Sequence, residues 1–230
     1  MSIYVKLIAA TPDAAKVVAA AAKLCYSASG AAEILDGLDA AKVASFLKML
    51  RESGHLSPFE HVSCSFAIEG ISRVATHQLV RHRVASYSQQ SQRYVGMSNQ
   101  SCIAPPSVMA IPEAEALFAK QTEEAWKCYD RLVELGVPKE DARFILPHGA
   151  ETRIVVTMNA RELHHFFALR LCRRAQWEIR ELARQMLVLV REASPEIFEL
   201  AGPSCVVNGT CGEAHPCGEP YENMEKMLSI

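Results

Sequence analysis

The segment 78–94 carries no carboxylate, although four of its residues are or can become cationic: Arg81, His82, Arg83 and Arg93. Six hydroxyl and amide side chains follow the first three of them: Ser86, Ser88, Gln89, Gln90, Ser91 and Gln92. A solvated surface normally mixes both charge signs, whereas a guanidinium can donate two parallel hydrogen bonds to a phosphate. The segment therefore predicts a site for an anionic ligand. For an isolated Arg-His-Arg, a basic helix end followed by a polar loop would be the preferred interpretation.

The composition limits the kinds of partner. The chain has 230 residues, a net charge of −2 and eight cysteines. No overall basic field points to nucleic acid. No apolar run approaches the roughly 20 residues of a membrane helix. The first residues lack a basic region ahead of a long apolar core, so the sequence predicts a cytoplasmic protein with reduced thiols and no membrane partner.

Hydrophobic periodicity and turn residues predict an α+β protein. Strands are expected at residues 3–8, 61–71 and 152–158. Helices are expected at residues 12–25, 40–52, 72–83, 113–135, 138–146, 160–170 and 175–192. Thr11, Ser72 and Asn159 are the expected N-caps, and Gly54 is expected to end the second helix. Residues 27–37, the polar segment after residue 83 and residues 97–112 are expected to be loops.

The residues alone support two hypotheses about function. Two arginine-rich stretches, 78–94 and 143–174, favour a phosphate-bearing small molecule. Neither a Gly-x-Gly-x-x-Gly nor a Walker-type loop is present, so dinucleotide or P-loop binding is not supported. The alternative is a regulatory module that binds phosphate or nucleic acid through residues 81–94. The negative net charge and the few aromatic residues in that stretch argue against it.

The C-terminal stretch contains four soft metal ligands with the spacing C-x5-C-x3-H-x-C: Cys205, Cys211, His215 and Cys217. Structural zinc sites usually begin with two cysteines two to four residues apart. The observed spacing departs from that pattern. It favours free or redox-labile thiols over zinc, and the sequence assigns no metal-binding residue.

A specific resemblance covers residues 55 to 180. Arg81-His82-Arg83, seven further residues and Ser91 match the R-H-R-x7-S signature of flavin-dependent thymidylate synthases. Other matching stretches follow in the same order as in that family: 55–61, Gln78, Ser91-x-Arg93-Tyr94, Arg143 before Ile-Leu-Pro, Asn159-Ala160-Arg161, Leu169-Arg170 and 175–178. The chain thus resembles this family over more than half of its length.

The resemblance implies an enzyme that makes dTMP from dUMP. In this family, 5,10-methylenetetrahydrofolate supplies the carbon, FAD carries the hydride and NADPH reduces the flavin, without an enzyme nucleophile. The implied fold has a central, mainly antiparallel sheet flanked by long helices. The implied assembly is a homotetramer whose active sites lie between subunits, with small-molecule substrates and no nucleic acid.

The family's roles carry over to matching positions of this chain. The resemblance places dUMP against Gln78, Arg81, Gln89, Gln90, Ser91, Gln92, Arg93, Arg143 and Arg170. It places FAD against His55, Ser57, Glu60, Arg81, His82, Arg83, Asn159, Arg161, His165 and Arg174. Arg170 and Arg81 are the expected catalytic residues, because a guanidinium near the uracil can polarise its carbonyls. Ser91 is assigned to binding.

The chain departs from the family at a few positions. Ser88 and Gln89 stand where many members have Asn and Glu, so a carboxylate is missing near the nucleotide. Arg174 stands where some relatives have His, and His165 where some have Asn. We expect one synthase domain at residues 1–200, followed by a cysteine-rich tail at residues 201–230 whose role the sequence does not assign.

Overall fold

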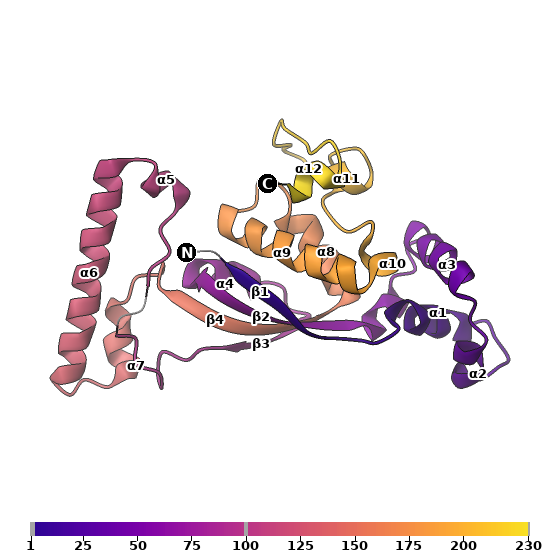
Figure 1. Cartoon of the computed structure of the whole chain (residues 1–230), viewed down its shortest axis with the longest axis horizontal. Coiled ribbons are helices and arrows are strands. Elements are labelled where there is room, and N and C mark those ends of the chain that lie inside the picture. Colours follow the sequence, from indigo (N-terminus) through magenta and orange to yellow (C-terminus); the bar gives the residue numbers. More distant parts are fainter. Residues whose placement is uncertain (1–2, 99–100, 230) are drawn as a thin grey trace. The chain divides into compact units, whose positions relative to one another are not determined.

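A computed structural model describes residues 3–98 and 101–229. Four strands form one sheet in the order β1–β2–β4–β3 (Figure 1). They are β1 (Tyr4–Ala10), β2 (Ser63–Ser72), β3 (Ala85–Gln89) and β4 (Glu151–Asn159). In β4, alternate residues are buried, among them Ile154, Val156 and Met158, as the period of two in a strand requires. The fold is mixed helix and antiparallel sheet, which confirms the predicted class.

The chain divides into two compact units that interleave along the sequence. Unit 1 comprises Ile68–Arg81, Tyr87–Val155 and the first residues of the chain. Unit 2 comprises Val5–Ala67, His82–Ser86 and the residues from Val156 onward. The divisions fall inside all four strands and between Arg81 and His82.

The described residues of unit 1 form five helical elements. They are α4 (Arg73–Leu79), α5 (Pro106–Met109), α6 (Pro112–Glu134), α7 (Lys139–Ala142) and the 3-10 turn η2 (Arg143–Ile145). Its small core forms where Met97, Tyr129 and Ala142 are buried together. The Tyr129 hydroxyl accepts a hydrogen bond from the backbone N–H of Met97 at 3.2 Å, so this buried donor is satisfied.

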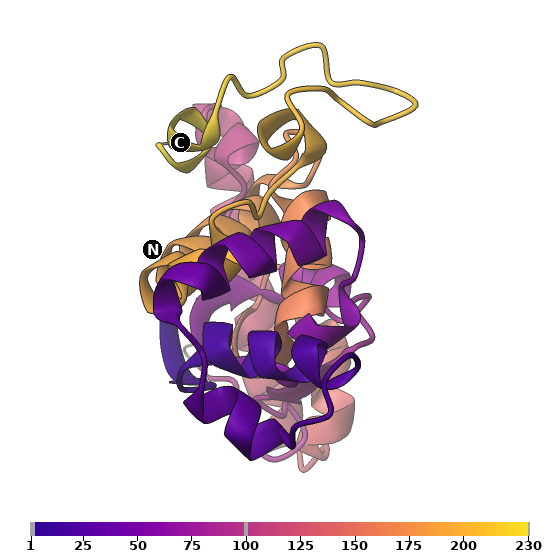
Figure 2. The same ribbon diagram turned by 90° about the vertical axis from the view of Figure 1, so that its right-hand side faces the viewer.

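Unit 2 contains the remaining helices. They are α1 (Ala14–Leu24), α2 (Ala31–Asp36), α3 (Ala40–Glu52), η1 (Ser57–His61), α8 (Ala160–Arg170), α9 (Trp177–Ala193), α10 (Pro195–Phe198), α11 (Ser204–Val207) and α12 (Met224–Leu228). Figure 2 shows α1, α2 and α3 grouped together. The main core lies where α8, α9 and α10 bury Phe167, Met186 and Phe198. Each such burial stabilises the fold by about 1.5–3 kcal/mol.

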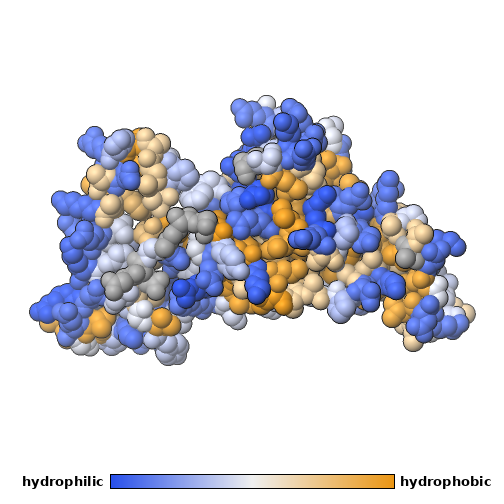
Figure 3. Space-filling model, in the orientation of Figure 1, coloured by the Kyte–Doolittle hydropathy of each residue, from blue (hydrophilic) through white to orange (hydrophobic). Residues whose placement is uncertain are grey.

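Apolar and polar residues gather on different parts of the surface. In Figure 3, hydrophobic residues gather over the sheet, and hydrophilic residues cover much of α6 and the C-terminal segment. Among the described residues, no helix is both long enough and apolar enough to cross a membrane.

Most of the predicted helix ends are confirmed. The Ser72 hydroxyl accepts from the Ala75 N–H at 3.1 Å, and Asn159 Oδ1 accepts from the Glu162 N–H at 2.8 Å. Both bonds satisfy a helix N–H that would otherwise lack a partner. Gly54 follows the end of α3 with a φ of 76°, a left-handed conformation that glycine adopts at low cost.

Five predictions of local structure are wrong. Residues 97–112 were expected to form a loop, but they include α5, and residues 99–100 of that stretch lie outside the described residues. Asp13, with a φ of 48°, precedes α1, whereas the predicted cap Thr11 accepts from the Ser63 N–H at 3.0 Å instead. Residues 27–37 were expected to form a loop but include α2. The helix from Ser72 was expected to reach residue 83 but ends at Leu79, and the polar segment after it forms β3. Pairing with β4 explains that strand, because the Gln90 N–H donates to the Arg153 carbonyl at 3.0 Å.

Candidate active site

Three arginines of unit 1, Arg73, Arg93 and Arg143, form what we call the arginine cluster. Arg93 Nε donates to Glu140 Oε2 at 2.7 Å, and Arg143 Nε donates to the Glu140 backbone carbonyl at 3.0 Å. Burial lowers the pKa of Arg73 below its ordinary value, and the neighbouring charge of Arg143 lowers it further. Glu140 is the one carboxylate in these contacts, and two of the guanidiniums bond to this residue. This excess of donors suits a phosphate.

Arg73 is a member of this cluster that sequence reasoning missed. Its Nη2 donates to the Gln90 carbonyl at 2.9 Å, while its buried Nε has no hydrogen-bond partner within the described residues. The available signal was its position directly after the cap Ser72. A cation in the first turn of a helix opposes the helix dipole, so some other interaction must favour it there.

The predicted dUMP residues around β3 are held by the protein itself. Gln89 Nε2 donates to Thr76 Oγ1 and to Thr152 Oγ1, both at 3.2 Å, which uses both of its hydrogens. Ser91 Oγ accepts from the Arg93 N–H at 3.2 Å and so shapes the turn that presents Arg93. Gln92 is buried. Gln89 therefore joins α4, β3 and β4, which gives the neutral amide at this position a structural reason.

In unit 2, three side chains form a hydrogen-bonded chain that we call the Glu162–His82–Arg170 relay. Arg170 Nε lies 3.0 Å from His82 Nε2, and His82 Nδ1 lies 2.9 Å from Glu162 Oε1. A guanidinium can only donate, so Nε2 accepts and Nδ1 carries the proton that it donates to Glu162. His82 is buried, and this burial lowers its pKa, which favours the neutral ring. Glu162 thus sets the tautomer of His82, and His82 orients Arg170.

Glu162 is the second residue that sequence reasoning missed. It stands three residues after the cap Asn159, where Glu is common because it favours the helix N-terminus. That ordinary role hid its contact with His82, which lies far away in the sequence.

His165 lies beside the relay, with its ring centre 5.6 Å from that of His82. One ligand atom from each of His82, Glu162 and His165 falls within 4.8 Å of the others. Both ring nitrogens of His82 are already engaged in hydrogen bonds, so the relay accounts for this grouping without a metal ion.

The other predicted flavin residues lie on exposed parts of unit 2. Arg161 Nη1 forms an ion pair with Glu60. Arg174 donates to the His215 carbonyl at 2.8 Å and lies 3.7 Å from Glu213, so the C-terminal segment holds it. His55, Ser57 and Arg83 are exposed or partly exposed, and Asn159 spends its side-chain oxygen on capping α8.

The two units therefore contain different halves of the predicted site. Unit 1 holds Arg81 and all the predicted dUMP residues except Arg170. Unit 2 holds Arg170 and all the predicted flavin residues except Arg81. The division runs through the Arg-His-Arg motif itself, because Arg81 ends a segment of unit 1 and His82 begins a segment of unit 2.

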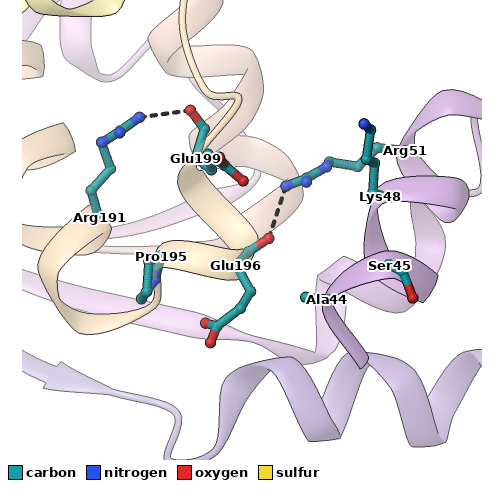
Figure 4. Close-up of a pocket in the computed structure, with 8 residues that line it drawn as sticks. All are labelled: Ala44, Ser45, Lys48, Arg51, Arg191, Pro195, Glu196 and Glu199. Atoms are coloured by element: carbon teal, nitrogen blue, oxygen red, sulfur yellow. Dashed lines mark hydrogen bonds between the residues drawn. The ribbon is translucent and has the colours of Figure 1, made fainter. Parts of the chain in front are cut away.

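A cavity of about 520 Å³ in unit 2 contains none of the predicted site residues (Figure 4). Its arginines serve the fold. Arg51 Nη1 donates to the carbonyls of Glu196 and Ile197 at 3.0 and 2.8 Å, and Arg191 Nη1 donates to the Glu199 carbonyl at 2.6 Å. Cations at these carbonyls stabilise the C-terminal end of the short helix α10. These cations therefore do not mark a ligand site.

Comparison with known proteins identifies the family of the chain. The family model described as thymidylate synthase complementing protein matches residues 6–196. A flavin-dependent thymidylate synthase from Geobacter sulfurreducens is 51% identical over 95% of each chain. One from Clostridium tetani is 47% identical over 96% of each chain.

A solved structure supports the same assignment. It is that of a UMP/dUMP methylase, PolB from Streptomyces cacaoi, bound with 5-Br dUMP. It superposes with a TM-score of 0.74 and 25% sequence identity over 86% of this chain and 93% of that one. Together with the family model and the curated relatives, this shows that the chain belongs to the family of flavin-dependent thymidylate synthases, which are methyltransferase-type enzymes.

Proposed function

We propose that this enzyme converts dUMP to dTMP by reductive methylation. The carbon donor is 5,10-methylenetetrahydrofolate, FAD carries the hydride, and NADPH reduces the flavin. Family membership and the 5-Br dUMP bound by the solved relative support the reaction. The single observation that carries the substrate assignment is the arginine cluster, which offers a phosphate three guanidiniums and engages one carboxylate.

In this proposal the arginine cluster and Ser91 bind the 5′-phosphate of dUMP. Arg93 and Arg143 supply charge-assisted hydrogen bonds, and the charge of the neighbouring Arg73 adds to the positive potential of the cluster. Gln78, which is half-buried on α4, and the polar run Gln89–Gln92 complete the pocket wall. Arg93 would exchange its bond to Glu140 for one to the phosphate, at little cost, because that ion pair is half exposed.

Arg170 acts at the uracil ring. The relay fixes the position of its guanidinium through the bond from Nε to His82 Nε2. As the ring is reduced, negative charge develops on its carbonyl oxygens, and a guanidinium fixed beforehand stabilises that charge. Ser91 binds without attacking, since no hydrogen bond joins its Oγ to a basic side chain in the part of the chain that the structure describes.

The proposed FAD site fits the donor set of unit 2 together with Arg81. Arg81 and Arg83 are exposed, and the described residues show no hydrogen-bonding or ionic partner for either guanidinium, which suits an anionic diphosphate. Glu60, paired with Arg161, offers a carboxylate for hydroxyl groups. His55, Ser57, Asn159, His165 and Arg174 would surround the rest of the cofactor. Bound there, the flavin supplies hydride transfer, while the protein supplies position and charge.

We further propose the homotetramer with active sites between subunits. Two site arginines are each followed by a large exposed apolar residue: Phe144, 86% exposed, follows Arg143, and Tyr94, 75% exposed, follows Arg93. Exposed apolar side chains grouped beside a polar site are typical of surfaces that another chain covers. Residues 1–200 would form the synthase domain, in agreement with the extent of the family match.

The test is direct. Purified protein supplied with FAD should show a flavin spectrum and should form dTMP from dUMP in a reaction that requires both methylenetetrahydrofolate and NADPH. Omitting either co-substrate should abolish product. If the protein retains no flavin, forms no dTMP and binds oligonucleotides in a salt-dependent way, the nucleic-acid hypothesis replaces this proposal.

A further inference from the structure

Four of the eight cysteines line one small pocket of unit 2. Its volume is about 130 Å³, and Cys172, Cys205, Cys211 and Cys217 all contribute to its wall. Cys172 lies two residues after the end of α8, Cys205 lies on α11, and the other two lie on the exposed segment that follows. All four thiols are free. The proposed synthase reaction uses none of them.

The set of four differs from the one that the sequence spacing suggested, because it contains Cys172 and lacks His215. His215 does not line the pocket, although Arg174 binds its backbone carbonyl at 2.8 Å. Cys172, which comes from a different part of the chain, takes its place. The sequence argument against zinc rested on the spacing within residues 205–217, and that argument does not apply to a set completed by Cys172.

Defined contacts hold the C-terminal segment in place. The Gly212 N–H donates to Ser204 Oγ at 2.9 Å. Tyr221 is buried, and the guanidinium of Arg173 lies 4.3 Å from its ring centre. Tyr221 lines the same pocket as Cys172 and Cys205. The convergence of the cysteines is therefore part of the fold.

The charges around the pocket suit a cation held by thiolates. Four thiolates around Zn²⁺ carry a net charge of −2, which the neighbouring Arg173 partly offsets. Glu213 adds a further negative charge beside the pocket, but it is paired with Arg174 at 3.7 Å. Glu219 also lines the pocket and remains a negative charge at its edge.

We propose that Cys172, Cys205, Cys211 and Cys217 bind one structural Zn²⁺ with tetrahedral geometry. Thiolate ligands select soft or borderline metals, and four of them form a closed structural site. No three of these sulfur atoms, all in described residues, lie within 4.8 Å of one another, so Cys211 and Cys217 move inward as the metal binds. Both cysteines are exposed, and such coupling of metal binding to local folding is usual for zinc sites. The metal would also fix the segment that carries Arg170 and Arg174.

The experiment measures metal content in the full-length protein. Protein purified without chelator, supplied with zinc and then desalted should contain one zinc per chain by plasma mass spectrometry. Cys172→Ser and Cys217→Ser should bind zinc at least about tenfold more weakly. Cys128→Ser is the matched control, since Cys128 is exposed on α6 in unit 1 and should leave zinc binding unchanged. Cobalt in place of zinc should show thiolate charge-transfer bands and the intense visible bands of a tetrahedral site.

Some outcomes would overturn the proposal. These are no zinc above background in the unaltered chain, full zinc content in Cys172→Ser, iron with inorganic sulfide in place of zinc, or a disulfide between these cysteines in protein isolated without reductant. Because a Ser variant can fail to fold, the unaltered protein is also treated with a chelator. Its unfolding midpoint should fall by about 5–10 °C and recover when zinc is restored. An unchanged midpoint on removal of bound zinc would contradict a structural site.

Discussion

The arginine cluster of unit 1 and the Glu162–His82–Arg170 relay of unit 2 use the same side chain in opposite settings. Arg93 and its partner Glu140 are each about half exposed, so their ion pair can be exchanged for a ligand. Arg170 instead donates to a buried imidazole whose other nitrogen is bound by a carboxylate. An exchangeable arginine suits binding of a phosphate that enters and leaves, whereas a fixed one suits stabilisation of charge in a transition state.

The largest effect that this comparison predicts is at Arg170. Arg170→Ala should lower kcat by about 100- to 1,000-fold, because a preorganised donor to developing charge is lost. Arg170→Lys should recover little, since a single ammonium cannot bond His82 and the base with a planar fork. Steady-state kinetics with dUMP as the varied substrate checks both variants. Full activity in Arg170→Lys would mean that charge alone suffices and that the relay has no positioning role.

Unit 2 should also be the more sensitive of the two to acid. Burial lowers the pKa of His164 to about 4, and the charge of Arg51 contributes. The neutral ring therefore contributes stability that is fully present above the unfolded pKa of about 6.5 and is lost as the pH falls toward 4. The loss is about 1.4 kcal/mol per pH unit, or about 3 kcal/mol in all. Denaturant unfolding at a pH of about 7.5 and again at about 5.5 should show about 1.4 kcal/mol of this loss, because about one pH unit of that interval lies below the unfolded pKa.

The control is His164→Gln, whose amide can still donate to the Ile197 carbonyl that His164 Nε2 contacts at 3.0 Å. This variant should lose less stability over the same pH interval than the unaltered protein. Equal losses in both proteins would assign the acid sensitivity to other groups.

Glu162→Ala should have the next largest effect. It leaves the His82 Nδ1–H buried without an acceptor, which costs about 1–3 kcal/mol and frees Arg170 to reorient. We expect kcat to fall by about 10- to 100-fold with little change in KM for dUMP. Glu162→Gln keeps an acceptor and should restore most of the activity. If both variants lose stability but retain kcat, Glu162 supports the fold alone.

The smallest effect should come from Glu140, the half-exposed partner of Arg93 in the arginine cluster. Glu140→Gln releases Arg93 from a half-exposed ion pair, so stability should change by less than about 1 kcal/mol. The KM for dUMP should stay the same or fall slightly, because Arg93 no longer has to leave a carboxylate. Thermal unfolding and initial rates test this, and a large rise in KM would show that Glu140 positions Arg93 for the ligand.

Local sequence signals predicted much of the fold. The caps Ser72 and Asn159, the glycine after α3, the alternation in β2 and the β-branched residues of β4 act between near neighbours, so they can be read from the chain. The errors arose where contacts between residues far apart in the sequence determine the local structure. Thr11 bonds Ser63 rather than capping α1, and the polar run after α4 becomes β3 because it pairs with β4.

The site shows the same limit. The resemblance named Arg170 and His82, but no local pattern linked them to Glu162, and only the fold brings Cys172 to the C-terminal cysteines. Arg73 was missed because the capped start of a helix explained the sequence around it. Long-range partners of buried or clustered polar groups were the part that the sequence did not reveal.

The most direct test of the division between phosphate binding and ring chemistry compares dUMP with deoxyuridine, which lacks the phosphate. The ratio of their dissociation constants is measured for the unaltered protein, Arg93→Ala and Arg170→Lys. Arg93→Ala should reduce the preference for dUMP by about 10- to 100-fold, the value of a charge-assisted hydrogen bond. Arg170→Lys should leave that preference within about twofold, because its guanidinium is assigned to the base. An unchanged preference in Arg93→Ala, or an equal loss in both variants, would contradict the separation of roles between the arginine cluster and the relay.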